Sequence, residues 1–380
     1  MEPRIACCRS LMMSRIRRFI HAAAADLERD IDTVSGAIGM GEGHHAKVRL
    51  LAYAGYRNDK LLRLRGRIVR YRKPLDAGQG TLTRLRAMME IYNSHEIAGV
   101  RVALQAYGHQ VETLSDGEGY FTFELPIDIP LPASTDWEQV MLSTPATEAQ
   151  QAQIPVPILA PGTDNHWGII SDIDDTVVET GATDFVKNWR RVLVDRPQDR
   201  LAVPGASTLY KMIARDHVSP VRPFFYVSSS PWNLYGFITE FMELNSIPHG
   251  PMFLKDYGID DNQFIRPSHG EHKLKAIETV LAFYPRLRFL LIGDNGQHDV
   301  TVYAKAVEDF GTRVAAVFIR DVDGSCRSGP EGELLAGIEA KGVPTFCGAS
   351  FGDAVDVVKA LNLDRPLEAA KAVVESAKTP

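Results

Sequence analysis

The stretch W-G-I-I-S-D-I-D-D-T-V-V-E-T-G-A, residues 167–182, places three aspartates directly after an apolar run. The run is typical of a strand that is buried on both faces of a parallel sheet. Asp172, Asp174 and Asp175 follow it, and burying an unpaired carboxylate is costly. The cluster therefore predicts a bound cation, a network of hydrogen-bond donors or a surface position at this point of the chain.

Further apolar runs follow the first, and helical patterns separate them. The runs cover residues 167–171, 223–227, 289–292 and 314–319. Alternation of strand and helix predicts an α/β fold with a doubly wound parallel sheet. Ligands of such sheets bind beyond the carboxyl ends of the strands, so the residues after each run are candidate site residues.

Carboxylates, hydroxyls and one ammonium occupy these positions. They are Asp172, Asp174 and Thr176 after the first run, Ser228 and Ser229 after the second, Asp294 and Asp299 after the third, and Lys273 at the start of a helix. A carboxylate can attack phosphorus and form an acyl phosphate. A second carboxylate two residues later can protonate the leaving group and then activate water.

The same residues carry a resemblance to a known family. D-I-D-D-T at 172–176, the serine after the second run, the lysine and G-D-N-G-Q-H-D at 293–299 together resemble the four motifs of the haloacid dehalogenase superfamily of phosphatases. S-D-I-D-D-T-V, F-Y-V-S-S-S-P-W-N-L, H-K and L-I-G-D-N-G-Q-H-D resemble more closely the actin-patch type of Mg²⁺-dependent phosphatidate phosphatase and its bacterial relatives. This resemblance covers residues 154–361 and implies a haloacid dehalogenase-like catalytic domain.

The resemblance implies a role for each motif residue. Asp172 is expected to be the nucleophile and Asp174 the general acid and base, and Ser228 and Lys273 are expected to stabilise charge on the phosphoryl oxygens. Mg²⁺ is the expected cofactor. Its ligands are expected to be Asp172, the backbone carbonyl of Asp174 and Asp294, with Asp299 in the outer shell.

The implied reaction is hydrolysis of a phosphomonoester through an aspartyl-phosphate intermediate, with phosphatidate converted to diacylglycerol. Ordinary helix and strand patterns fill the intervals between the motifs, with only V-V-E-T-G-A at 177–182 as a flap, so no large cap domain is expected. An open site favours a bulky or surface-bound phosphoester. Two alternatives stay open at this point. One is a phosphatase of a soluble metabolite or phosphoprotein, and the other is a non-catalytic lipid-binding scaffold.

Other readings of the motifs are weaker. A calcium-binding EF-hand loop would have glycine where Val177 stands, and the aspartates follow a strand. His272 and His298 flank motif residues and either orient them or have structural roles. A metal site at His44 and His45 is disfavoured.

The length of 380 residues predicts two domains with an extension, since domains average about 150 residues. We expect an amphipathic helical extension at 1–45, with its helix at 14–38, and a small β-sandwich at 46–150. A linker at 145–164 leads to the phosphatase domain at 151–365, and 366–380 form a tail. On the sandwich, Arg63, Arg65 and Arg67 alternate along one strand, which indicates a solvated face rather than an anion site.

The net charge of -6 is unevenly distributed, because residues 1–75 contain many arginines and few acids. We therefore expect this basic part to contact an anionic membrane surface and expect no nucleic-acid partner. The absence of a signal-peptide pattern and of a long apolar run predicts a cytoplasmic location, peripheral to a membrane. Cys7, Cys8, Cys326 and Cys347 match neither a zinc spacing nor a disulfide framework, so reduced thiols are expected.

Overall fold

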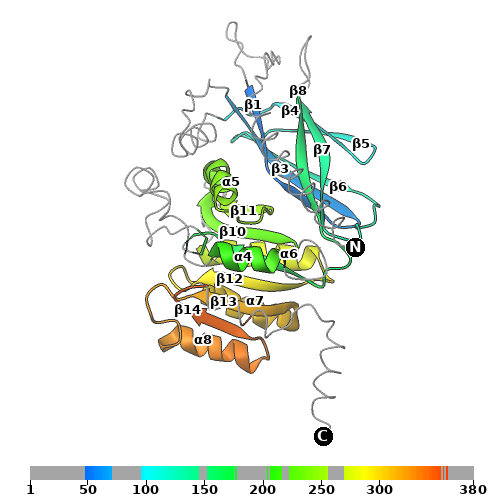
Figure 1. The fold of residues 1–380 in the computed structure, drawn as a ribbon. Coiled ribbons are helices and arrows are strands. Elements are labelled where there is room, and N and C mark those ends of the chain that lie inside the picture. Colours follow the sequence, from blue (N-terminus) through cyan, green and yellow to red (C-terminus); the bar gives the residue numbers. More distant parts are fainter. Residues whose placement is uncertain are drawn as a thin grey trace. The chain divides into compact units, whose positions relative to one another are not determined.

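The computed structural model describes residues 48–70, 96–144, 152–174, 176–177, 203, 206–215, 222–255, 269–351, 354 and 357. The predicted N-terminal helix, the segment 178–182, the C-terminal tail, Asp175, His44 and His45 lie outside the described residues. The chain divides into two compact units, and the first ends at Ala160 (Figure 1). Strands β1 to β8 come before this point, and β9 to β14 with helices α4 to α8 come after it.

The first unit is built from short strands that pair mainly in the antiparallel sense. They are β1 (Val48–Ala52), β2 (Gly55–Arg57), β3 (Leu61–Arg70), β4 (Arg101–Ala106), β5 (His109–Leu114), β6 (Tyr120–Pro126), β7 (Asp136–Thr144) and β8 (Ala152–Ala160). Their order is β1-β3-β2-β8-β7-β4-β5, with β6 paired to β3, and β2 runs parallel to β8. Because the described strands form one hydrogen-bonded sheet, the expected β-sandwich stays a prediction.

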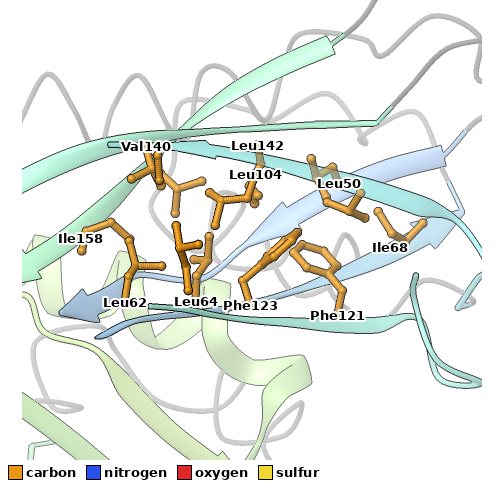
Figure 2. Close-up of a cluster of buried hydrophobic side chains, with 14 of the residues drawn as sticks. Leu50, Leu62, Leu64, Ile68, Leu104, Phe121, Phe123, Val140, Leu142 and Ile158 are labelled. Atoms are coloured by element: carbon orange, nitrogen blue, oxygen red, sulfur yellow. The ribbon is translucent and has the colours of Figure 1, made fainter. Parts of the chain in front are cut away.

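The core of this unit follows from the two-residue period of its strands. Leu62 and Leu64 of β3 point to the same face as Phe123 of the paired strand β6, and Leu104 and Leu142 come from β4 and β7. Figure 2 shows these side chains pointing toward one another in one buried cluster. The alternation of apolar and polar residues thus directs one face of each strand into the core.

Three arginines of β3, at positions 63, 65 and 67, lie on the other face of that strand and contact neighbouring groups. Arg63 lies 2.8 Å from Glu124, and the guanidinium of Arg65 lies 4.3 Å from the ring centre of Tyr120. Arg67 is buried and lies 3.1 Å from Glu96. The expectation of a solvated face is therefore wrong for Arg67, because the ring of Tyr120 on the paired strand β6 and the carboxylate of Glu96 cover it.

The predicted linker is partly wrong. Ala152–Ala160 form strand β8, which pairs antiparallel with β7 along its whole length. The prolines of this segment indicate a linker, but they stand at alternating positions of a strand whose Val156 and Ile158 pack into the core. The expected domain boundaries stay predictions.

The second unit contains a six-stranded sheet in which every described pair is parallel. Its strands are β9 (Trp167–Asp172), β10 (Phe224–Pro231), β11 (Met252–Lys255), β12 (Arg288–Asp294), β13 (Val314–Arg320) and β14 (Thr345–Gly348). Its helices are α4 (Ala206–Arg215), α5 (Tyr235–Leu244), α6 (His269–Phe283), α7 (Asp299–Phe310) and α8 (Gly329–Ala340), with single 3-10 turns at η2 (Trp232–Leu234) and η3 (Gly311–Arg313). The prediction of an α/β fold with a parallel sheet is confirmed, and the sequence did not reveal β11 and β14.

Strand order places β9 inside the sheet, between β10 and β12. The order is β11-β10-β9-β12-β13-β14, so the chain runs outward from β9 first on one side and then on the other. Every residue of β9 is buried, as its continuous apolar run indicated. The carboxyl ends of β10 and β12 therefore flank the carboxyl end of β9.

The expectation of reduced thiols is wrong for two of the four cysteines. Cys326 and Cys347 form a disulfide, with their Cα atoms 6.5 Å apart. Cys347 lies in β14, and Cys326 lies in the loop after its parallel neighbour β13, so the sheet brings together two residues that are distant in sequence. Cys7 and Cys8 lie outside the described residues. Among the described helices, none has the length and apolar composition needed to cross a membrane.

We predict that Leu142→Ala lowers the free energy of unfolding of the first unit by about 2–5 kcal/mol, because Leu142 is fully buried and its truncation leaves a cavity. Hydrogen exchange of the β7 amides during urea unfolding would measure this loss. Leu114→Ala is the matched control, because Leu114 is 60% exposed and its loss should change stability by no more than about 0.5 kcal/mol. Equal effects of the two substitutions would contradict the packing of this cluster.

Candidate active site

Three strand ends and two helix starts converge on one buried group of polar residues in the second unit. β9 ends at Asp172, β10 contributes Ser228, β12 ends at Asp294, and α7 begins at Asp299. Lys273 lies near the start of α6, four residues after His269. The structure thus brings together the residues that the sequence predicted for the site, and all of them are buried.

Lys273 is the cation at the centre of this group. Its Nζ lies 2.8 Å from Oδ1 of Asp172 and 2.5 Å from Oδ1 of Asp299. Lys273 thus forms a buried ion pair with Asp172, and it donates a hydrogen bond to Asp299. Among the described residues, Oδ2 of Asp172 has no hydrogen-bond partner, so this carboxylate keeps acceptor capacity for a ligand.

The electrostatics of the site are dominated by burial and by like charges. Burial raises the pKa of Asp172 well above its ordinary value; Lys273 opposes this shift, and Asp299, Asp174 and Asp294 add to it. For Lys273, burial acts to lower the pKa, but Asp172, Asp299 and Asp294 outweigh it and the pKa is raised. Lys273 therefore remains charged, and in the described part of the chain one ammonium faces several carboxylates.

Asp294 is held in place from several directions. Its Oδ1 accepts a hydrogen bond from the amide of Gly296 at 2.6 Å, and the Thr176 hydroxyl donates to its Oδ2 at 3.4 Å. The amide of Asp294 donates to Oδ2 of Asp299 at 3.3 Å. Asp299 thus uses one oxygen for Lys273 and the other for the backbone of Asp294, so it orients its neighbours.

Three of these carboxylates suit a small divalent cation. Ligand atoms of Asp172, Asp294 and Asp299 lie within 4.8 Å of one another, and all three side chains are buried. Carboxylate oxygens are the donors that Mg²⁺ and Ca²⁺ prefer. The unused acceptor capacity of Asp172 and the excess of negative charge around Lys273 fit a cation at this position.

Asp174 faces the hydroxyls of β10. Ser228 donates to Oδ2 of Asp174 at 2.6 Å, and the Ser230 hydroxyl lies 3.0 Å from Oδ1 and 3.2 Å from Oδ2. The backbone amide of Ser230 donates to Oγ of Ser228 at 2.8 Å. Sequence reasoning missed Ser230, although the two-residue period of a strand would place it on the same face as Ser228.

The two histidines beside the motifs have different positions. Nε2 of His272 lies 3.4 Å from the carbonyl oxygen of Phe253, and burial lowers the pKa of His272. His298 stands before α7 with a left-handed φ of 65°. Both flank the site residues Lys273 and Asp299 in the chain, as the sequence indicated.

Asn295 is a second residue that sequence reasoning missed. Its Nδ2 donates to Asp323 at 2.7 Å and to Asp321 at 3.1 Å, and its Oδ1 accepts from the amide of Val322 at 2.7 Å. The Asn295 side chain, directly after Asp294, thereby fixes the loop after β13. Its partners are about 26 to 28 residues away in the chain, so no local pattern indicated them.

The part of the chain that carries the site resembles known proteins. Residues 167–321 match the family described as "Phosphatidate phosphatase APP1, catalytic domain". The predicted resemblance to the actin-patch type of phosphatidate phosphatase is confirmed. The match begins with β9 and ends just after β13, so it contains every site residue that the sequence predicted.

Curated relatives match the same region. Phosphatidate phosphatase APP1 of Saccharomyces cerevisiae is 34% identical over 154 residues, which is 40% of this chain and 25% of that protein. An uncharacterized protein of Schizosaccharomyces pombe is 27% identical over 159 residues, 42% of this chain and 26% of its own length. The chain thus spans about a quarter of the length of these relatives.

Among solved structures, a carbohydrate acetylesterase from Xanthomonas citri aligns with 81% of this chain and 71% of its own, at 11% identity and a TM-score of 0.29. A similarity of this size carries no argument about fold or chemistry.

We predict that Gly293→Ala destabilises the second unit by about 1–3 kcal/mol, because overpacking a buried position forces neighbouring groups apart. An added Cβ at Gly293 would lie 2.5 Å from Oδ2 of Asp299 and 2.6 Å from the hydroxyl of Tyr303. Thermal unfolding would measure the loss. The control is Gly337→Ala on the exposed surface of α8, where a Cβ meets nothing within 4 Å and helix propensity should add up to about 1 kcal/mol. A Gly293→Ala protein as stable as the parent would contradict this packing.

Proposed function

We propose that the protein is a Mg²⁺-dependent phosphatase that hydrolyses a phosphomonoester through an aspartyl-phosphate intermediate, with phosphatidate as its substrate. One observation carries the proposal. Asp172 is buried beside Lys273 and the carboxylates of Asp294 and Asp299, within the segment that matches the phosphatidate phosphatase catalytic domain. A buried carboxylate with free acceptor capacity and a neighbouring ammonium suits nucleophilic attack on a phosphoryl group.

In the first half-reaction, an oxygen of Asp172 attacks phosphorus while the bond from phosphorus to the leaving oxygen breaks. Asp174 donates its proton to that leaving oxygen, so an alcohol departs instead of an alkoxide. Lys273, which lies 2.8 Å from Asp172, is close enough to meet a phosphoryl oxygen brought to this carboxylate. The Ser228 hydroxyl donates a second hydrogen bond to the phosphoryl group.

In the second half-reaction, Asp174 takes a proton from water as the water oxygen attacks phosphorus. The bond from phosphorus to the Asp172 oxygen breaks, inorganic phosphate leaves, and both aspartates return to their starting states. Asp174 thus alternates between acid and base, and the hydroxyls of Ser228 and Ser230 hold it within reach of β9.

We assign Asp172 and Asp294 as the side-chain ligands of Mg²⁺ together with the backbone carbonyl of Asp174. Asp299 orients them through Lys273 and through the amide of Asp294. A bound Mg²⁺ would neutralise the clustered charge and polarise the phosphoryl oxygens. Asp294 is positioned for this role by the amide of Gly296 and the hydroxyl of Thr176.

The proposed substrate rests on the family match, because the site residues themselves specify phosphoryl transfer and do not contact a leaving group. We include in the proposal a haloacid dehalogenase-like architecture, a β-sandwich in the first unit, and a cytoplasmic location with the basic N-terminal part at a membrane surface. A phosphate-release panel with phosphatidate, lysophosphatidate, sugar phosphates and phosphopeptides tests the substrate. Release from a soluble phosphoester alone would favour the alternative of a metabolite or phosphoprotein phosphatase.

We predict that Asp172→Asn lowers phosphate release by more than about 1,000-fold, because an amide cannot serve as the attacking carboxylate. The fold should survive, since the substitution removes one of several like charges around Lys273. The control is Asp309→Asn on the exposed surface of α7, which removes the same charge and should leave the rate within a few-fold of wild type. Turnover by Asp172→Asn near the wild-type rate would remove Asp172 from the nucleophilic role.

Magnesium should be required for activity, and calcium, which is larger and accepts more ligands, should bind without supporting the wild-type rate. Asp294→Ala should raise the magnesium concentration for half-maximal activity by more than about tenfold, because it removes a predicted ligand. The same variant should lose most of the rise in melting temperature that magnesium gives the wild type. Full activity of the EDTA-treated enzyme, or an unchanged magnesium titration of Asp294→Ala, would overturn the metal assignment.

A further inference from the structure

Two serines of strand β10, Ser228 and Ser230, bind the carboxylate of Asp174. Both hydroxyls are fully buried, and both donate hydrogen bonds to the carboxylate of Asp174. Ser228 reaches one carboxylate oxygen, whereas the Ser230 hydroxyl lies within hydrogen-bond distance of both oxygens, at 3.0 and 3.2 Å. This bridging position restricts rotation of the carboxyl group about its Cβ–Cγ bond.

The two serines cannot have the same role during the reaction. A serine hydroxyl has one hydrogen to donate, and Ser228 gives it to Oδ2 of Asp174 in this structure. When Ser228 donates to a phosphoryl oxygen, as in the proposed function, that hydrogen is no longer available to Asp174. Of the two serines, Ser230 is then the one that still holds this carboxyl group.

We propose that Ser230 is the positioning residue for Asp174, a role that rests on the proposed function. Its hydroxyl keeps the carboxyl group aimed at the leaving oxygen in the first half-reaction and at the water in the second, while Ser228 is engaged with the phosphoryl group. Its backbone amide also orients Oγ of Ser228 at 2.8 Å. Because that amide remains in an alanine variant, Ser230→Ala removes only the contact with Asp174.

A double-mutant cycle tests this role. The proteins are wild type, Asp174→Asn, Ser230→Ala and the double variant, and the probe is dioctanoyl phosphatidate with magnesium. We expect Ser230→Ala to lower kcat/KM by about 10- to 100-fold, the size of a hydrogen bond to a charged group. We expect Asp174→Asn to lower it by about 100- to 10,000-fold. The double variant should be no slower than Asp174→Asn, because Ser230 acts through that side chain.

A second readout separates positioning from general damage to the fold. With p-nitrophenyl phosphate the leaving group departs without a proton, so Ser230→Ala should lower kcat/KM much less than with phosphatidate. The ratio of the two kcat/KM values does not depend on the fraction of protein that is folded. Ser230→Thr, which restores a hydroxyl, should return the ratio toward the wild-type value. Ser229→Ala is the matched control from the intervening position, and its effect should be additive with Asp174→Asn.

The outcomes distinguish this role from the proposed function. Wild-type protein that releases phosphate from neither substrate would overturn both. Active wild type with an equally active Asp174→Asn would remove Asp174 from acid-base catalysis and Ser230 with it, while the phosphatase activity would stand. Three outcomes would overturn the positioning role alone. They are a Ser230→Ala protein with wild-type kcat/KM, a Ser230→Ala effect that adds to that of Asp174→Asn, and an equal loss of kcat/KM with both substrates.

Discussion

The ion pairs of Lys273 are the interaction on which the site depends. Its ammonium lies between Asp172 at the end of β9 and Asp299 at the start of α7, and Lys273 itself belongs to α6. All three groups are buried, and loss of the ammonium would cost about 3–5 kcal/mol because it would leave both buried carboxylates without their cation. The pairs therefore connect a strand and two helices, and the site can form only when these elements are docked together.

Strand order supplies the second constraint. Because β9 lies between β10 and β12, residues that are 54 and 118 positions apart in the chain meet at one sheet edge, as the contacts of Ser228 with Asp174 and of Thr176 with Asp294 show. Close approach also needs space, and Gly293 provides it directly before Asp294. A side chain at this position would occupy the place of the Asp299 carboxylate, so the small residue is a requirement of the site's packing.

The sequence predicted the parts of this site that lie within one strand end or helix start. Asp172, Ser228 and Asp294 each follow an apolar run, and a run of this kind identifies both the strand and its carboxyl end. The two-residue period of β10 places Ser230 on the same face as Ser228, but the partner of that face is known only once the neighbouring strand is known. The contacts of Asn295 depend on β12 and β13 being adjacent, and the disulfide of Cys326 depends on β13 and β14 being adjacent. No local pattern encodes either neighbour. The prolines of β8 predict a linker, whereas its pairing with β7, which is not local in sequence, makes it a strand.

The surroundings of Asp294 hold its carboxylate rigidly. Its side chain is fixed by Gly296 and Thr176, and its backbone amide by Asp299, so its oxygens have little freedom to adapt to an ion. The next residue, Asn295, is tied through its amide group to the loop after β13, which prevents the end of β12 from shifting. Mg²⁺ demands near-ideal octahedral geometry, whereas Ca²⁺ accepts flexible sites with more ligands. A carboxylate held this firmly can meet the strict octahedral geometry of Mg²⁺. The hydrogen bonds that fix Asp294 therefore support the proposed choice of Mg²⁺.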